Sequence, residues 1–319
     1  MSNKKNALFF VIAGAILIVL IVILSFGWLR GLSDDTTDSN LPTIAVSIYP
    51  MYAFISPLYS DSANVELIAQ GDPHFFEPTP SDVRTIKDSD YFIYNGIIDE
   101  WVNDFKNDAG DTIFIDASEY IDVIETDHAH SDEHSEAEEH TDSDHEGEEK
   151  HEDDSSTEHS HNEDPHYWVE PGRVRQIIDR LGSEIDLEQN QQLINDLQAM
   201  EIDYRTSLNE CSVRSVVVDH NAFGYLAESY RFQVFTVYED EEKSSINPRE
   251  LLELTDTISE QNLEYLLVTE ESNPEIQNDV LEQLEILPLN TIESSDSSKT
   301  YIDYLSENLN TLQTALNCE

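Results

Sequence analysis

The sequence predicts an α/β protein of two lobes with mainly parallel sheets, joined by one long helix and preceded by an N-terminal transmembrane helix. Short apolar runs alternate with segments of helical periodicity in both halves of the chain, which is typical of parallel sheets. Between the halves, residues 172–208 have helical periodicity. An uncharged apolar run at residues 7–29 lies near the start of the chain.

The apolar run at residues 7–29 follows Lys4 and Lys5 and is long enough to span a bilayer with the lysines inside. A cleaved signal peptide is the alternative, but its apolar region is usually about 7–15 residues long and small residues mark its cleavage site. The bulky Trp28 and Leu29 make a poor cleavage site, and no Cys directly follows for a lipid anchor. We therefore expect residues 1–40 to form a cell-membrane anchor and tether, with the folded part extracytoplasmic.

The first lobe is expected over residues 41–167. Its strands are expected at residues 44–48, 65–69, 91–95 and 112–116. A helix should begin near Met51, and a second should begin at Pro80, with Thr79 as its N-cap.

Residues 125–164 have a different composition from the rest of this lobe. They contain 18 Asp and Glu, one Lys and eight of the chain's 11 His, and their net charge is −17. A segment so poor in apolar residues cannot bury enough surface to become ordered, so a long mobile loop is predicted. Its histidines are His128, His130, His134, His140, His145, His151, His159 and His161.

A linker helix is expected over residues 168–208 and the second lobe over residues 209–319. Apolar residues recur on one face of the linker, and Gly182 is the one candidate for an interruption. The second lobe should contain strands at 215–219, 233–237, 265–269 and 285–289 and helices at 222–230, 248–260, 274–284 and 300–316.

The charge balance excludes nucleic acid as a partner. The chain has 16 Lys and Arg against 67 Asp and Glu, a net charge of −51, and cannot neutralise a phosphate backbone. The segment at 125–164 accounts for −17, and the remaining −34 suggests adaptation to a salty exterior or a surface that concentrates cations. The two cysteines, Cys211 and Cys318, are expected to pair outside the cytoplasm, and two separate thiols are the alternative.

Outside the acidic segment the chain has three histidines, and all three have a similar setting. His74 and His220 follow expected strands, and His166 lies just before the linker helix. Ligands of open α/β sheets bind beyond the carboxyl ends of the strands, so these side chains could converge. Neutral imidazole is a common ligand of zinc and similar metals, although a single such His is more often a packing or capping residue.

Three segments that contain these histidines resemble the signature segments of the zinc and manganese solute-binding proteins of ABC transporters, the ZnuA-like family. The segments are Gly71-Asp72-Pro73-His74-Phe75-Phe76-Glu77-Pro78, Asp164-Pro165-His166-Tyr167-Trp168 and Asp219-His220-Asn221-Ala222-Phe223-Gly224. They occur in the same order as in the family, and the resemblance runs from about residue 43 to the C-terminus.

This resemblance implies two α/β lobes joined by a rigid helix, with a metal in the cleft between the lobes held by His74, His166 and His220. The position of the His-rich loop between the first two ligands favours Zn²⁺ over Mn²⁺. The implied function is an extracytoplasmic component that captures Zn²⁺ and delivers it to an ABC permease and its ATPase. We expect a monomer without enzymatic activity. A manganese-specific member of the same family is the alternative.

The fourth ligand is where the sequence departs from the family pattern. Family members commonly have an Asp near the last strand, whereas the matching stretch here is Leu289-Asn290-Thr291-Ile292-Glu293. Asn290, Glu77, Glu293 or a water molecule are the candidates. Zinc prefers His, Cys and carboxylate ligands, so an amide oxygen would be a weak one.

Two other functions remain open on the sequence alone. A three-His zinc can be catalytic, but no HExxH-like pair is present to support a hydrolase. A surface metal scavenger or adhesin without a transporter is the third hypothesis. The loop histidines are expected to collect zinc weakly and pass it on, and a purely solvating acidic insertion is the alternative.

Overall fold

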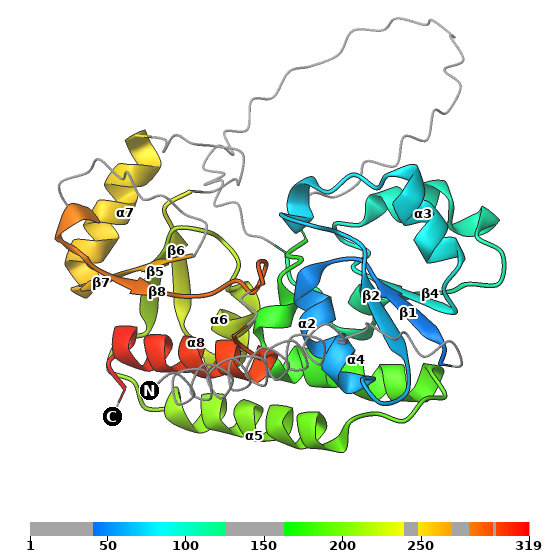
Figure 1. The fold of residues 1–319 in the computed structure, drawn as a ribbon. Helices are drawn as coiled ribbons and strands as arrows, with labels where there is room; N and C mark the ends of the chain where they lie inside the picture. Colours follow the sequence, from blue (N-terminus) through cyan, green and yellow to red (C-terminus); the bar gives the residue numbers. More distant parts are fainter. Residues whose placement is uncertain (1–40, 126–162, 239–247, 270–280, 296–297, 319) are drawn as a thin grey trace, which may run out of the picture. The chain divides into compact units, whose positions relative to one another are not determined.

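The computed structural model describes residues 41–125, 163–238, 248–269, 281–295 and 298–318 (Figure 1). Among these residues no helix combines the length and the apolar character needed to cross a bilayer. The expected membrane anchor at residues 7–29 and the eight histidines of the acidic segment lie outside the described residues.

The first lobe is built on a parallel four-stranded sheet with the order β2-β1-β3-β4. The strands are β1 (Thr43–Val46), β2 (Asn64–Leu67), β3 (Tyr91–Tyr94) and β4 (Ile113–Asp116), and the helices are α2 (Tyr49–Leu58) and α3 (Pro80–Lys87). Thr79 caps α3 in a reciprocal capping box with Asp82, as the sequence predicts. The four expected strands of this lobe are confirmed.

The second lobe repeats this topology. Its parallel sheet has the order β6-β5-β7-β8, so in both lobes the first strand lies between the second and the third. Its elements are β5 (Ser215–Val218), α6 (Gly224–Tyr230), β6 (Gln233–Thr236), α7 (Pro248–Gln261), β7 (Tyr265–Val268), β8 (Glu285–Pro288) and α8 (Tyr301–Ala315). Most of the helix expected at 274–284 lies outside the described residues.

Short 3₁₀ helices complete the two lobes. They are η1 (Pro73–Phe75), η2 (Glu100–Asp104), η3 (Lys106–Asp108), η4 (Ala117–Tyr120), η5 (Tyr167–Val169) and η6 (Leu281–Gln283). Two of them, η1 and η5, lie at or beside histidines that the sequence marks as ligand candidates.

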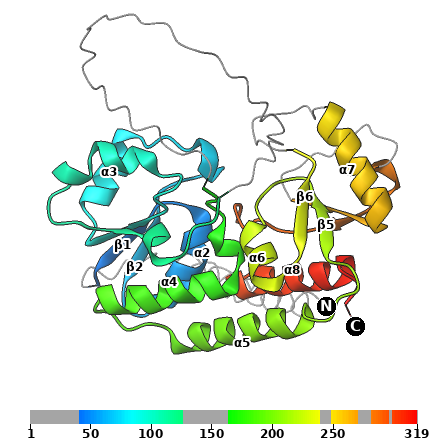
Figure 2. The same cartoon turned by 180° about the vertical axis from the view of Figure 1, so that it is seen from behind.

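The prediction of one long linker helix was wrong. The segment forms two helices, α4 (Pro171–Glu184) and α5 (Gln191–Ser207), which lie side by side in both views (Figures 1 and 2). Gly182 remains inside α4, and the chain turns after it. At this turn Asn190 donates its backbone N–H to the Leu58 carbonyl at 2.8 Å and its side-chain amide to the Pro57 carbonyl at 3.2 Å. Contacts with the end of α2 therefore stabilise the turn between α4 and α5, which the apolar periodicity does not indicate.

One cluster of buried apolar side chains extends across both sheets and the helices between them. It includes Ile44 and Val46 of β1, Val216 and Val218 of β5, Ile177 of α4, Leu197 of α5 and Leu305 of α8. Trp168 is the largest fully buried side chain and belongs to the same cluster. The segment that contains His166 is therefore embedded in packed core.

A disulfide joins Cys211, which precedes β5, to Cys318 at the end of the chain. Backbone hydrogen bonds support the same junction, because Val213 donates to the Leu316 carbonyl at 2.9 Å and Ser212 donates to the Asn317 carbonyl at 3.2 Å. The bond closes a loop with a sequence separation of 107 residues. A covalent loop of this length restricts the unfolded chain strongly.

We expect replacement of Cys211 and Cys318 together by Ser to lower the free energy of unfolding by about 2–4 kcal/mol, because the unfolded chain regains the freedom that the bond removes. Urea unfolding followed by circular dichroism measures the change. A reductant should destabilise the natural protein and leave the double Ser variant unaffected. Equal stability of the two oxidised proteins would contradict the prediction.

Candidate metal site

Four side chains from four separate segments form one cluster. They are His74 in η1 after β2, His166 before η5, His220 after β5, and Glu293 after β8. One potential ligand atom from each lies within 4.8 Å of the others. The structure thus brings together the three histidines that the sequence predicts, and among the described residues no other group of three or more His, Cys, Asp or Glu could hold a metal.

His166 is oriented by a buried carboxylate. Its Nδ1 lies 2.7 Å from Oδ1 of Asp164, and the two side chains are 3% and 2% exposed. The same oxygen accepts the His166 backbone N–H at 2.9 Å. This pairing directs Nε2 toward the cluster, where it lies 3.2 Å from Nε2 of His74. A carboxylate on the outer imidazole nitrogen is the usual companion of a metal-ligating His.

Glu293 supplies an oxygen to the cluster. Its Oε1 lies 3.2 Å from Nε2 of His74 and 3.4 Å from Nε2 of His166. Its Oε2 accepts a hydrogen bond from the Thr291 hydroxyl at 2.8 Å. The other two protein candidates for the fourth ligand are placed differently, since Asn290 Oδ1 accepts the Ile292 N–H at 2.6 Å and Glu77 is exposed.

The electrostatics of the cluster favour a cation. Burial alone would lower the pKa of His166, but the hydrogen bonds and charges of Asp164 and Glu293 outweigh it and raise the pKa to about 10. Burial alone would raise the pKa of Glu293, but hydrogen bonds with His166 and His74 hold it well below its ordinary range. Burial, followed by the charge of His166, lowers the pKa of His220 to about 4. A neutral His220 and an ionised Glu293 offer electron pairs to a positive ion, which at neutral pH would take the place of the proton on His166.

The donor set is typical of zinc. Zinc in proteins is commonly four-coordinate, with nitrogen from His and oxygen from carboxylates among its ligands. Three imidazoles and one carboxylate fit that requirement. Cys211 and Cys318 are joined in a disulfide and offer no thiolate.

Sequence reasoning missed the residues that support the ligands. The repeated tripeptide Asp-Pro-His was a sequence signal for Asp164. In the structure both copies form the same contact, because Asp72 accepts the His74 backbone N–H and Asp164 accepts that of His166. Thr291 carried no comparable signal. Its role depends on a hydroxyl that meets Glu293 two residues away, inside a turn.

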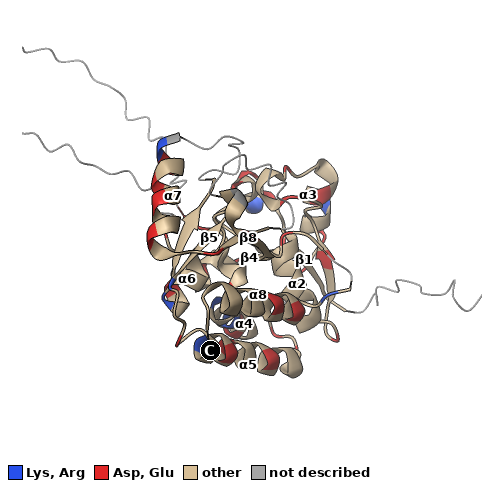
Figure 3. Cartoon of the chain, turned by 90° about the vertical axis from the view of Figure 1, so that its left-hand side faces the viewer, with Lys and Arg blue, Asp and Glu red and all other residues tan. Residues whose placement is uncertain are grey.

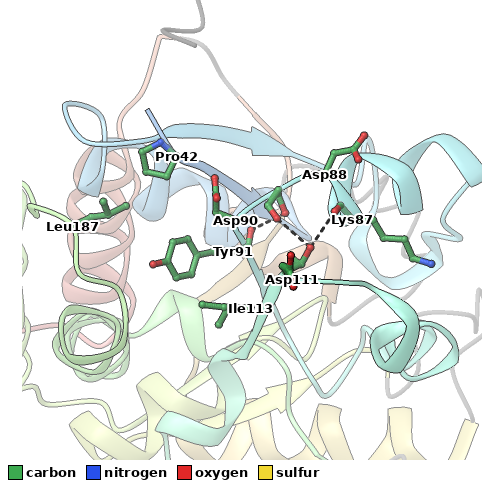
Figure 4. Close-up of a pocket in the computed structure, with 10 residues that line it drawn as sticks. Pro42, Lys87, Asp88, Asp90, Tyr91, Asp111, Ile113 and Leu187 are labelled. Atoms are coloured by element: carbon green, nitrogen blue, oxygen red, sulfur yellow. Dashed lines mark hydrogen bonds between the residues drawn. The ribbon is translucent and has the colours of Figure 1, made fainter. Parts of the chain in front are cut away.

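Acidic residues also occur far from this cluster. Figure 3 shows Asp and Glu along α3, α5, α7 and α8. A separate pocket is lined by Asp90, Asp111 and Lys87, at the amino ends of β1, β3 and β4 (Figure 4). It contains none of the four cluster residues, and His74 follows the opposite, carboxyl end of β2.

Comparison with known proteins also points to zinc. A family model described as "Zinc-uptake complex component A periplasmic" matches residues 44–315. The "High-affinity zinc uptake system protein ZnuA" of Bacillus subtilis is 27% identical over an alignment of 338 positions, which covers 98% of each chain. The "Zinc-binding lipoprotein AdcA" of Streptococcus pneumoniae is 28% identical, and the match covers 85% of this chain but 55% of AdcA, so this chain spans about half of that protein.

A solved structure shares the fold. The Zn(II)-bound ZnuA-like domain of Streptococcus pneumoniae AdcA has a TM-score of 0.64 and 21% identity, and the match covers 87% of this chain and all of that domain. The family model confirms the expected resemblance. Since the family model matches nearly the whole sequence after the first 43 residues, this chain belongs to the zinc-uptake complex component A family.

Proposed function

We propose that this chain is the extracytoplasmic zinc-binding component of a metal ABC importer, which captures Zn²⁺ at His74, His166, His220 and Glu293 and delivers it to a permease and its ATPase. The convergence of three imidazole nitrogens and one carboxylate oxygen within 4.8 Å carries this proposal. The names of the B. subtilis and S. pneumoniae relatives, a zinc uptake protein and a zinc-binding lipoprotein, support it.

The ligand set favours zinc over manganese. Imidazole suits Zn²⁺, whereas Mn²⁺ is better served by carboxylate, carbonyl and water oxygens in an octahedral arrangement. A cluster that is three-quarters nitrogen therefore suits zinc. Its one carboxylate, Glu293, faces two imidazoles as a ligand would, which favours binding and transfer over hydrolysis.

The remaining organisation follows from the sequence and is part of the proposal. Residues 1–40 anchor a monomer in the cell membrane through a single span at 7–29, residues 41–167 and 209–319 form the two lobes, and residues 168–208 link them. The histidines of residues 125–164 collect zinc weakly and raise its concentration near the cluster. A relative named as a lipoprotein supports attachment outside the cytoplasm.

Replacing His74, His166 or His220 by Ala should each weaken zinc binding by at least about 100-fold, because loss of a direct ligand costs more than loss of an outer-shell partner. Glu293→Gln should also weaken binding. Competition with a chromophoric chelator measures these affinities. Glu77→Gln is the matched control, since that carboxylate is exposed and outside the cluster. Unchanged zinc affinity in the His variants would contradict the assignment of these residues to the zinc site.

Zinc binding should release about one proton at neutral pH, because the raised pKa of His166, about 10, means that zinc must displace a proton there. Affinity should therefore increase roughly tenfold per pH unit between pH 6 and 8. Calorimetry in buffers with different ionisation enthalpies counts the protons. A pH-independent affinity over this range would contradict the displacement of a proton from His166 by zinc.

Replacing residues 126–162 by a short Gly-Ser linker should abolish weak zinc binding and preserve one tight site. The replacement is feasible because Glu125 and Glu163 pair across the base of the segment, and Asp164 donates its N–H to the Ile124 carbonyl at 2.9 Å. Titration calorimetry with elemental analysis measures both classes of site. A full-length variant with all eight loop histidines changed to Ser is the control. Loss of the tight site would show that the segment contributes ligands to it.

A further inference from the structure

We propose that Thr291 is a specificity-determining residue, whose hydroxyl restricts Glu293 to a single ligand oxygen and so favours four-coordinate zinc over metals that take more oxygen ligands. The inference rests on the proposed function, since it requires Glu293 to bind the metal. It assigns a task to a residue that itself contributes no ligand atom.

The two oxygens of Glu293 have different neighbours. Oε1 faces the imidazoles, at 3.2 Å from His74 Nε2 and 3.4 Å from His166 Nε2. Oε2 accepts the Thr291 hydroxyl at 2.8 Å. Thr291 and Glu293 are 5% and 8% exposed, so this hydrogen bond lies in a largely dry environment. One oxygen is directed to the ligand cluster and the other is held by the hydroxyl.

The turn that contains Thr291 and Glu293 is held by hydrogen bonds from α8. Asn308 of α8 accepts the Asn290 N–H and donates its side-chain amide to the Asn290 carbonyl, both at 2.8 Å. The Asn290 side chain in turn accepts the Ile292 N–H at 2.6 Å. Ile292 has a φ of 64°, which is strained for a β-branched residue. A strained conformation persists only where surrounding contacts impose it, so the direction of the Glu293 side chain is fixed by this turn.

Thr291 is also tied to the segment that contains His166. Trp168 Nε1 donates to the Thr291 carbonyl at 2.7 Å, and the Trp168 ring is fully buried. The Trp168 and His166 rings are in edge contact, with centroids 5.2 Å apart. The backbone of Thr291 is therefore held relative to the segment of His166, while its hydroxyl contacts Glu293.

Coordination number connects this geometry to metal choice. Three imidazoles and one carboxylate oxygen give the four ligands that zinc prefers, whereas Mn²⁺ suits a larger set of oxygens. If the hydroxyl were removed, the buried Oε2 would lose the donor shown here at a cost in free energy. Binding the metal through both oxygens would recover that loss, and the site would then accept Mn²⁺ more readily.

The test compares Thr291→Val, which has nearly the same shape but no hydroxyl, with Thr291→Ser, which keeps the hydroxyl. Competition titrations with Zn²⁺ and Mn²⁺ give the ratio of the two affinities. Visible absorption of the Co²⁺-loaded protein reports coordination number, since four-coordinate Co²⁺ absorbs far more strongly than five- or six-coordinate Co²⁺. We expect Thr291→Val to lower the zinc-to-manganese affinity ratio about tenfold, the lower end of the effect of an outer-shell partner. Its Co²⁺ absorption should weaken, and Thr291→Ser should match the natural protein.

Three results would overturn the inference: no change of ratio and spectrum in Thr291→Val, an equal change in Thr291→Ser, or unchanged zinc affinity in Glu293→Gln. Thr291→Ala also removes the hydroxyl and replaces Thr291→Val if that variant does not fold. Failure of the natural protein to bind Zn²⁺ in the same titrations would refute the proposed function itself. If the natural protein binds Zn²⁺ and Glu293→Gln weakens that binding, a silent Thr291→Val refutes only the role of Thr291.

Discussion

The contact between His166 and Asp164 is the interaction on which the rest of the site depends. A buried imidazole without a hydrogen-bond partner can turn either ring nitrogen toward a metal. In His166 the Asp164 carboxylate lies 2.7 Å from Nδ1, so Nε2 is the nitrogen that faces the cluster. Asp164 is held in turn by the second lobe, because the Tyr225 hydroxyl donates to its carbonyl at 2.7 Å. Gly224 permits this approach, since a Cβ there would lie 2.7 Å from Asp164 Oδ2. Residues of α6 thus contribute to the orientation of His166, which lies 58 residues before Gly224.

The acidity of the chain has two separate physical consequences. Within the cluster, the buried carboxylates Asp164 and Glu293 create a negative potential that little solvent screens, and this is where charge contributes to metal affinity. Over the rest of the surface, acidic side chains are spread along several helices (Figure 3) and are screened by salt over about 8–10 Å. The local pair of carboxylates favours a cation at the cluster, whereas the distributed charge acts on solubility and on self-repulsion of the folded state.

The sequence was sufficient to predict the strands and to single out the three histidines, because both follow from local patterns. Apolar runs mark buried parallel strands, and ligands gather beyond their carboxyl ends. The break between α4 and α5 was not predictable in this way, since it depends on Asn190 meeting the end of α2, more than 130 residues away along the chain. The sequence also did not predict which of Glu293 and Asn290 lies beside the histidines. The Asn290 side chain accepts the Ile292 N–H, and Asn308 holds the Asn290 backbone, whereas the Glu293 carboxylate faces His74 and His166.

The four residues of the cluster are divided unequally between the two lobes, and under the proposed function this bears on release. His220 and Glu293 follow strands of the second sheet, and His166 is joined to the same lobe through Trp168, which donates to the Thr291 carbonyl and accepts from the Tyr301 hydroxyl. His74 alone among the four follows a strand of the first sheet. A displacement of the loop after β2 would therefore lower the coordination number from four to three and leave three ligands as a preassembled group. Zinc would then have an open position for an incoming ligand, which allows transfer by exchange without a fully desolvated free ion.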